Sequence, residues 1–394
     1  MVIDHNDTPE LLLLASEFPP GPGGIGHHAY QLARHLSRRE WAVTVIAPQP
    51  YVSAAEREAF NRRQLFDIIP LPEREAGSGG SVRRMRVIFD AVRTRPSAVL
   101  VATGHRALLT AGVIGAVTRR PWLAVGHGSE FLVRSRLYTL LTRRAIESAA
   151  VVVAVSEYTA GLIRAAARPR QLVVIPNAAD GERYRPGLDT AALRARWGVG
   201  DGPVLLTVGQ VSERKAQDVV IRALPRILTE HPDLTYVIAG LPTMQESFAA
   251  LADELGVAGR VVFAGKVPDD DLPMAYNMAD IFALVSRRTA AGDVEGFGIV
   301  VQEAALCGVP AIVSRDCGLT EAIREGETGL SVPPDDPEAT AAAILTLLGD
   351  EPRRREMGQR ARQAALTATW SERIDEYDLI LRGLLAPRPE LSRP

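Results

Sequence analysis

Two glutamates with glycines between them form the most chemically informative segment of the chain. In GDVEGFGIVVQEAALCGVPAIVS, residues 292–314, seven residues separate Glu295 from Glu303, and they include Gly296 and Gly298. Since glycine lacks a Cβ, the backbone there can approach a ligand closely. Glutamates at this spacing are also common on ordinary surface helices. The Gly-Phe-Gly turn directly after an apolar run favours a ligand site instead.

The elements predicted around these glutamates indicate the kind of ligand. A strand is expected at 281–286, and a helix is expected to run to Gly308. Free amides at a helix start carry partial positive charge and can face a phosphate or sugar hydroxyls. These amides belong to Phe297, Gly298, Ile299 and Val300. Glu303, about one turn further in, can accept hydrogen bonds from a ribose diol.

A second glycine-rich loop lies near the start of the chain. Gly21, Gly23 and Gly26 match the G-x-G-x-x-G pattern of dinucleotide sites. In such sites the glycines follow the first strand directly, and an acidic residue ends the second strand. Here Phe-Pro-Pro intervenes and the second strand ends VIAPQ, so an NAD oxidoreductase is a lesser alternative. What remains is a Gly23–Gly24 turn leading into a helix whose amides can hold a diphosphate.

The rest of the chain alternates short apolar runs with Ala/Leu/Arg-rich helical segments. Strands are predicted at 11–18, 42–48, 66–71, 97–104, 122–128, 150–156 and 172–177, then at 204–210, 234–240, 261–265, 281–286, 310–314 and 329–333. Such alternation indicates βαβ units and parallel sheets. With 394 residues and a linker near 178–203, the sequence predicts twin doubly wound α/β domains facing a cleft. Ligands of such sheets bind at the carboxyl ends of strands.

Charge is distributed unevenly along a chain of net charge −2. Residues 1–180 hold 22 Arg, no Lys and 15 acidic residues, a balance of +7, and the remainder carries −9. The basic half suggests an anionic acceptor or a membrane surface as partner, although arginines also decorate solvated helix faces. No nucleic-acid partner is expected. The sequence predicts a cytoplasmic protein, because its two cysteines lack metal-type spacing and it has no basic signal region and no 20-residue apolar run. Peripheral contact at the inner face of the membrane is a further expectation.

Several ordered motifs together resemble one known family. E-G-F-G-x-x-x-x-E, with LLTVGQVSERKAQDVVIRAL (205–224), VVFAGKVPDDDLPMAYNMADIFALVS (261–286) and VIPNAAD (174–180), is similar to retaining glycosyltransferases of family 4, also called group 1. The resemblance implies the GT-B architecture of two Rossmann-like domains. It implies an acceptor-side domain at 1–178, joined by a helix at 370–388 that crosses back to it, and a nucleotide-sugar donor domain at 179–369.

The resemblance also assigns residues to the donor diphosphate. The Gly23–Gly24 loop would contact it, and Lys215, six residues after the glycine that ends a strand, would clamp it. The family usually has Arg directly after that glycine, whereas this chain has Gln210. Arg214, beside Lys215, is a candidate replacement for the missing charge, or a solvated residue.

Contacts with the donor sugar and nucleoside follow from the same resemblance. His127, in LAVGHGSEF, would contact the sugar near the reacting carbon, and Glu130 would orient His127 or touch the acceptor. Glu295 would bind the sugar and Glu303 the ribose. His27 and His28 are expected to be helix-start residues only. The backbone of Lys266 and Val267 is the expected place for the base.

No metal or other cofactor is expected. The run Asp269–Asp271 contains D-x-D, which holds a metal in a different glycosyltransferase architecture, but here it opens a predicted helix and is explained by N-capping and by complementarity to the helix dipole. The expected activity is a metal-independent hexosyltransferase (EC 2.4.1 type) that moves a hexose, with retention, from a GDP-mannose or UDP-glucose type donor. The acceptor would be a hydroxyl of a glycan, glycolipid or small molecule. Alternatives are a nucleotide-sugar epimerase or hydrolase on the same frame, and a non-catalytic sugar-nucleotide-binding protein.

Overall fold

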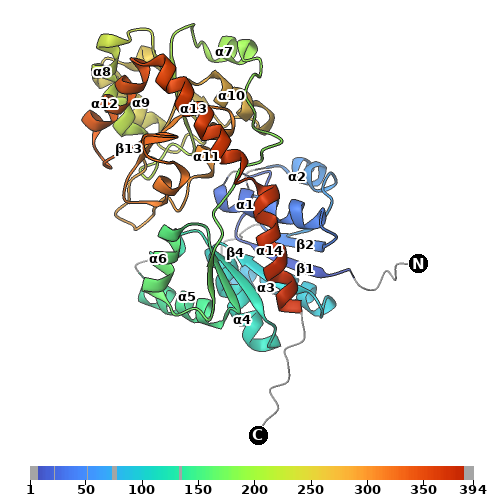
Figure 1. Cartoon of the computed structure of the whole chain (residues 1–394). Helices are drawn as coiled ribbons and strands as arrows, with labels where there is room; N and C mark the ends of the chain where they lie inside the picture. The colour runs from blue at the N-terminus through green and yellow to red at the C-terminus, as the bar shows by residue number, and fades with distance from the viewer. Residues whose placement is uncertain (1–7, 22, 51, 73–77, 133–134, 386–394) are drawn as a thin grey trace. The chain divides into compact units, whose positions relative to one another are not determined.

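The structure is a computed structural model that describes residues 8–21, 23–50, 52–72, 78–132 and 135–385. Residues 1–7 of the predicted first domain and 386–388 of the predicted crossing-back helix lie outside these ranges. The chain divides into two compact units, one made of 1–176 with 370–394 and the other of 177–369 (Figure 1).

The first unit is built on a parallel sheet with the strand order β3-β2-β1-β4-β5-β6-β7. Its described strands are β1 (Glu10–Ala15), β2 (Ala42–Ala47), β3 (Asp67–Pro70), β4 (Val99–Thr103), β5 (Trp122–Gly126), β6 (Val151–Ala154) and β7 (Leu172–Val174). The central strands are apolar and buried along their length, as expected where helices cover both faces. The order reverses between β1 and β4, so the loops after these strands diverge and leave room for a ligand.

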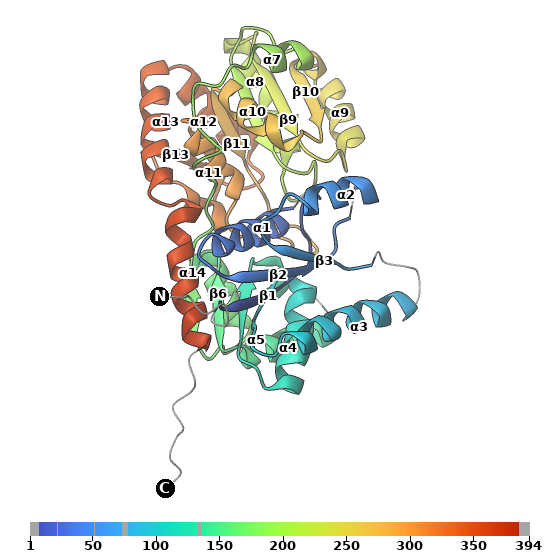
Figure 2. The same ribbon diagram turned by 90° about the vertical axis from the view of Figure 1, so that its right-hand side faces the viewer.

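Helices cover this sheet, and the last one comes from the end of the chain. They are α1 (Gly24–Ser37), α2 (Ala54–Asn61), α3 (Ser78–Thr94), α4 (His105–Thr118), α5 (Arg136–Ser148), α6 (Glu157–Ala166) and α14 (Trp370–Leu385), with the 3-10 turn η1 (Ser129–Phe131). Helix α14 lies beside α1 (Figure 2). Trp41 Nε1 donates to Asp378 Oδ1 at 2.6 Å, and the Arg39 guanidinium pairs with Asp375 at 2.8 Å. These contacts tie α14 to the first unit.

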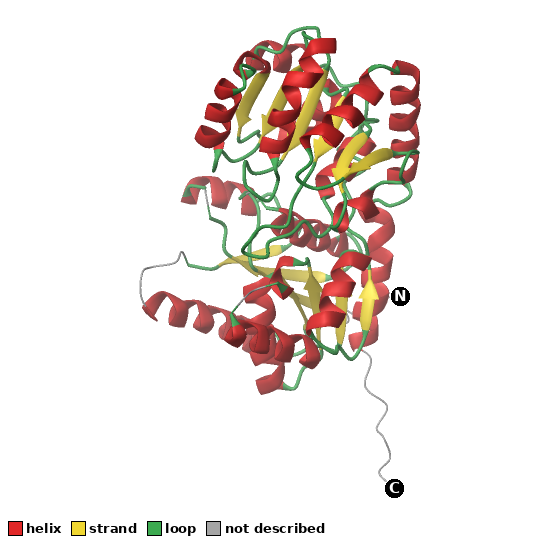
Figure 3. Cartoon of the chain, turned by 90° about the vertical axis from the view of Figure 1, so that its left-hand side faces the viewer, coloured by secondary structure: helices red, strands yellow, loops and turns green. Residues whose placement is uncertain are grey.

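The second unit has its own parallel sheet, with the order β10-β9-β8-β11-β12-β13. Its described strands are β8 (Val204–Val208), β9 (Thr235–Ala239), β10 (Val261–Gly265), β11 (Ile281–Leu284), β12 (Ala311–Ser314) and β13 (Gly329–Val332). The helices are α7 (Ala191–Trp197), α8 (Gln217–Glu230), α9 (Gln245–Glu254), α10 (Leu272–Met278), α11 (Ile299–Leu306), α12 (Pro337–Leu348) and α13 (Glu351–Leu366), with 3-10 turns η2 (Ala258–Arg260), η3 (Asp269–Asp271) and η4 (Gly318–Ala322). In each unit the strands lie between helices (Figure 3). Here the order reverses between β8 and β11.

The observed architecture confirms the predicted fold class of doubly wound parallel α/β sheets. Each predicted apolar run overlaps one observed strand, which usually ends earlier because the predicted runs included loop residues. The acidic run at 269–271 differs from its prediction. It forms η3, and Asp271 stands at the N-cap of α10 without a side-chain capping hydrogen bond. Its carboxylate pairs with the Arg196 guanidinium instead, so the run opens the helix as predicted but without a side-chain capping hydrogen bond.

None of the helices in the described ranges has both the length and the apolar content that crossing a bilayer requires.

Candidate active site

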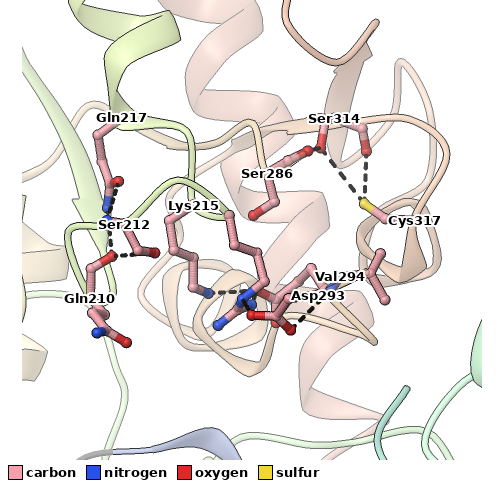
Figure 4. Close-up of polar contacts among 11 residues, drawn as sticks. Gln210, Ser212, Lys215, Gln217, Ser286, Asp293, Val294, Ser314 and Cys317 are labelled. Atoms are coloured by element: carbon pink, nitrogen blue, oxygen red, sulfur yellow. Dashed lines mark hydrogen bonds and ion pairs between the residues drawn. The ribbon is translucent and has the colours of Figure 1, made fainter. Parts of the chain in front are cut away.

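Charged side chains meet where the strand order of the second sheet reverses. Strands β8 and β11 are parallel neighbours, so the loops that follow them emerge at the same edge. Lys215, from the loop after β8, donates from Nζ to Glu295 Oε2 at 2.7 Å. Arg214 donates to the same carboxylate oxygen, and its Nε lies 3.0 Å from Asp293 Oδ2. Figure 4 labels Lys215, from the loop after β8, and Asp293, from the loop after β11.

The charges in this cluster shift one another's pKa values. Lys215 and Glu295 are mostly buried, with side-chain exposures of 10% and 13%. Burial alone would raise the pKa of Glu295, but the charges of Lys215 and Arg214 outweigh it and lower this pKa to about 2. Burial lowers the pKa of Lys215, partly opposed by Glu295, whereas Glu295 raises the pKa of Arg214. Glu295 is therefore an anion at any physiological pH.

The backbone after β8 allows Lys215 to fold back over the end of the strand. Gly209 has φ 149°, and a Cβ at this position would lie 3.1 Å from Lys215 Cε. The next residue, Gln210, donates from Nε2 to Thr243 Oγ1 at 2.7 Å, and its carbonyl accepts from Gln217 Nε2 at 3.0 Å (Figure 4). Gln210 is thus a neutral side chain tethered to Thr243.

The Gly296–Gly298 turn is held against η4 so tightly that glycine is required. Gly318 donates its backbone N–H to the Glu295 carbonyl at 3.0 Å, and a Cβ on Gly318 would come within 1.9 Å of the Gly296 oxygen. Gly298 has φ 84° and forms the N-cap of α11, where a Cβ would meet Leu319 at 2.3 Å. The close backbone approach at Gly318 and the Leu319 side chain packed against Gly298 therefore place the first amides of α11.

Glu303 lies one turn into α11 and is 5% exposed. Tyr276 donates its hydroxyl to Glu303 Oε2 at 2.6 Å. Burial raises the pKa of Tyr276, and the Glu303 charge raises it further, so the tyrosine stays a donor. Lys266 is exposed and Val267 is buried, directly after β10 at the edge of the sheet.

In the first unit, the start of α1 holds an anion supplied by the chain itself. Gly23, at the N-cap of α1, has φ 143°. The Glu17 carboxylate occupies the space that a Cβ at position 23 would need, 2.3 Å from it, and accepts from the Gly26 N–H at 3.1 Å. At the start of the helix predicted to cradle a diphosphate, the Gly26 amide therefore donates to a carboxylate of the chain itself, which is the same type of contact.

His127 follows β5 and is fixed on two sides. Its Nε2 lies 2.7 Å from Thr103 Oγ1, and its backbone N–H points at the Glu130 carboxylate, 3.1 Å from Oε1 and 3.2 Å from Oε2. Burial lowers the pKa of His127 to about 3. The imidazole is therefore neutral near pH 7, and Glu130 orients the loop through the backbone.

Comparison with known proteins decides the family. Residues 22–183 match the profile described as Glycosyltransferase Family 4, and residues 189–364 match the one described as Glycosyl transferases group 1. A GDP-mannose-dependent alpha-(1-6)-phosphatidylinositol monomannoside mannosyltransferase of Mycolicibacterium smegmatis is 34% identical over 368 residues, covering 90% of this chain and 94% of the relative. The chain is a family 4 glycosyltransferase.

Other similar proteins support the same assignment. A D-inositol 3-phosphate glycosyltransferase of Acidothermus cellulolyticus is 36% identical to the glycosyltransferase over 232 residues, which is 56% of this chain and 50% of that protein. Among solved structures, Anabaena HepE in complex with UDP and glucose has a TM-score of 0.79 at 21% identity, covering 95% of this chain and all of that one. WaaG, a glycosyltransferase involved in lipopolysaccharide biosynthesis, has a TM-score of 0.73 at 18% identity and covers 95% of this chain and 100% of its own. These structures show the GT-B fold.

The predicted family is confirmed, and the chain is a nucleotide-sugar glycosyltransferase of the hexosyltransferase type.

The structure of the glycosyltransferase brings some predicted site residues together and leaves others apart. Lys215, Arg214 and Glu295 form one ionic cluster in the second unit. Gln210, five residues before Lys215 in the sequence, donates its side-chain hydrogen bond to Thr243 instead. Among the described residues, no group of three or more His, Cys, Asp or Glu is arranged to hold a metal.

Sequence reasoning missed two residues of the glycosyltransferase. Glu17 carried one usable signal, an acidic side chain just after β1 and before the glycine loop. His28 was treated as a helix-start residue, but it is 1% exposed, with Nε2 3.1 Å from the Tyr377 hydroxyl. Its ring lies 5.0 Å from the His127 ring in an edge-on arrangement, and burial lowers its pKa. No local signal pointed to a partner 349 positions away.

Proposed function

We propose that this glycosyltransferase transfers mannose from GDP-mannose, with retention of the anomeric configuration, to a hydroxyl of a lipid-linked or inositol-containing acceptor. The observation that carries the proposal is the buried pairing of Lys215 and Arg214 with Glu295 at the β8/β11 reversal. Mannose is supported by the name of the Mycolicibacterium smegmatis relative, which matches over 90% of the chain, and an inositol-containing acceptor is supported by the names of both curated relatives.

Departure of GDP needs positive charge where the diphosphate develops negative charge. In the second unit Lys215, Arg214 and the amides at the start of α11 supply it. In the first unit the Gly23–Gly24 turn at the start of α1 would contribute further amides. Lys266 and Val267 would present their backbone to the base, and Glu303, oriented by Tyr276, would accept hydrogen bonds from the ribose.

Glu295 and His127 would position the sugar. Once the diphosphate pairs with Lys215 and Arg214, the Glu295 carboxylate is released to accept hydrogen bonds from sugar hydroxyls. Neutral His127 can donate or accept without a net charge. Both groups then favour the oxocarbenium-like geometry of the transition state.

Retention is proposed to proceed by attack on the same face that the diphosphate leaves. The C1–diphosphate bond breaks while the C1–acceptor bond forms, and a donor phosphate oxygen takes the acceptor hydroxyl proton. A double displacement would instead require a carboxylate nucleophile that forms a covalent sugar intermediate. Lys215 and Arg214, which would pair with the departing diphosphate, support metal-independent transfer, which predicts full activity in EDTA.

The first unit would meet the acceptor at a membrane. Residues 1–180 carry a charge balance of +7, which favours anionic acceptors and peripheral contact with an anionic bilayer at the inner face of the cytoplasmic membrane.

Incubation of the purified enzyme with GDP-mannose or UDP-glucose, each with and without a phosphatidylinositol-type acceptor, tests the proposal. We expect mannosylated product with an α-linkage by NMR, and thermal stabilisation by GDP rather than UDP. Stabilisation by UDP alone would indicate a UDP-sugar donor instead of GDP-mannose, and an inverted linkage would exclude retention. Donor hydrolysis or epimerisation without acceptor would favour the nucleotide-sugar hydrolase or epimerase, and binding without turnover would favour a sugar-nucleotide-binding protein.

A further inference from the structure

Large apolar side chains are exposed mainly on two neighbouring helices of the first unit. In the described part of the chain, eleven large apolar side chains are exposed, and six of them lie on α4 and α5. They are Val113, Val117, Leu137, Tyr138, Leu140 and Leu141. Soluble proteins usually scatter such residues singly, so a concentration of them indicates an interaction site.

Helices α4 and α5 pack directly on each other. A Cβ on Gly112 of α4 would lie 2.9 Å from Ala145 Cβ of α5, so the two backbones are close. His105 Nε2 lies 3.2 Å from Thr142 Oγ1, and the His105 ring is 5.4 Å from that of Tyr138. The exposed residues of both helices therefore belong to one neighbourhood, which we call the α4–α5 face.

The first half of α5 is unusual because it buries nothing. Every residue from 135 to 141 is exposed, and burial begins at Thr142 and continues with Ala145 and Ile146. Leu137, at 63% exposure, and Leu140, at 48%, are therefore not part of the core of the unit. A helix that presents leucines to solvent over two turns is typical of a surface that docks elsewhere.

The charges around these leucines are basic. Arg136, Arg143 and Arg144 are exposed on α5. The acidic residue of the helix, Glu147, pairs with Arg143 at 2.8 Å. Leucines flanked by arginines match a bilayer with anionic head groups, where the leucines enter the acyl boundary and the guanidinium groups contact phosphates.

We propose that the α4–α5 face docks the glycosyltransferase on an anionic lipid bilayer. The proposal rests on the lipid-linked acceptor of the proposed function and names the surface that reaches it. Helix α5 begins five residues after Phe131, the end of the η1 turn that contains Glu130. Because Glu130 holds the His127 backbone, docking of α5 brings the His127 loop to the membrane surface that carries the acceptor.

Vesicle sedimentation tests the docking surface directly. The full chain is mixed with vesicles of phosphatidylcholine alone, or of phosphatidylcholine with phosphatidylinositol. We expect binding to the anionic vesicles, weakened by salt. We expect Leu137→Ser/Leu140→Ser/Leu141→Ser to reduce it by about tenfold or more, since apolar burial drives insertion, and Arg136→Gln/Arg144→Gln to remove most of its salt dependence.

A matched control separates position from composition. Leu65→Ser/Leu379→Ser removes leucines of the same unit that are even more exposed, at 73% and 76%, and it should bind vesicles like the wild type. Equal binding by the triple variant and the wild type, or no binding of the wild type to anionic vesicles, would overturn the proposal. The proposal would also be overturned if the wild type formed dimers that the triple variant cannot form while both proteins bound vesicles equally. The α4–α5 face would then bind a second copy of the chain.

Activity on a water-soluble inositol acceptor separates this proposal from the proposed function. The triple variant should keep wild-type turnover on that acceptor while losing turnover on vesicle-embedded acceptor. If the wild type and every variant are inactive on both acceptors, the proposed function is contradicted. Vesicle sedimentation then tests the docking surface on its own.

Discussion

Lys215 Nζ lies 2.7 Å from Glu295 Oε2, although the two residues are 80 positions apart in the chain. They meet because β8 and β11 are adjacent parallel strands whose following loops leave the sheet at one edge. The pair is mostly buried and shared with Arg214, so each charge is held in place by its partner. A donor diphosphate would exchange one anion for another at the same cations.

Replacing Glu295 by glutamine should separate binding from turnover. Glu295→Gln keeps the side-chain size but removes the charge, so we expect kcat to fall by about a hundredfold or more. GDP should bind as tightly as before or more tightly, because Lys215 and Arg214 lose a competing carboxylate. Steady-state kinetics and calorimetry with GDP measure both effects. Asp293→Asn is the matched control, since Asp293 contacts Arg214 from a more exposed position, and equal losses in the two variants would contradict the prediction.

Restoring a cation at position 210 should strengthen diphosphate binding. Gln210→Arg places a guanidinium beside the end of β8, and a charge-assisted hydrogen bond of about 1.5 kcal/mol corresponds to GDP binding roughly tenfold more tightly. Calorimetry at low and high salt measures the gain, which should shrink as salt rises. Thr243→Ala is the control, because it releases the Gln210 tether without adding charge. A gain of the same size in the control would show that tether release is responsible.

Acid should destabilise the protein partly through His127. Its pKa falls from 6.5 to about 3 on burial. Below pH 6.5 the His127 side chain therefore binds a proton in the unfolded chain but not in the folded chain. Stability from this residue is therefore present above pH 6.5 and is lost progressively as pH falls toward 3. Urea unfolding at a series of pH values should show a shallower loss for His127→Gln than for the wild type. Parallel curves for the two proteins would be inconsistent with a buried neutral imidazole.

The turn before α11 should not tolerate a side chain. Gly298→Ala forces a Cβ into Leu319 at φ 84°, so we expect it to destabilise the fold by about 2 kcal/mol or more. It should also raise KM for the donor, because the first amides of α11 move. Gly326→Ala is the control, since Gly326 has φ 72° with no atom within 4 Å of its Cβ position, and it should cost only about 1 kcal/mol. Equal stability losses would mean that backbone strain alone matters at Gly298.

The sequence by itself determined the elements and the family. Apolar β-branched runs such as 204–210 predicted strands because burial and backbone preference act locally, and the E-G-F-G motif with its accompanying motifs identified the glycosyltransferase family. The role of Lys215 in diphosphate binding was predicted from the family resemblance and stays a prediction. The acidic run Asp269–Asp271 precedes α10 as predicted, but the Asp271 side chain pairs with Arg196, 75 positions away, and makes no capping hydrogen bond.

Only the tertiary structure decided which side chains meet. It set Arg214 against Glu295 and Asp293, seated Glu17 on the start of α1, and buried His28 between His127 and the C-terminal helix. The physical reason is that residue spacing encodes local backbone geometry and periodicity, whereas strand order decides which loops lie side by side. Charges placed tens or hundreds of residues apart become partners only when the sheets have formed.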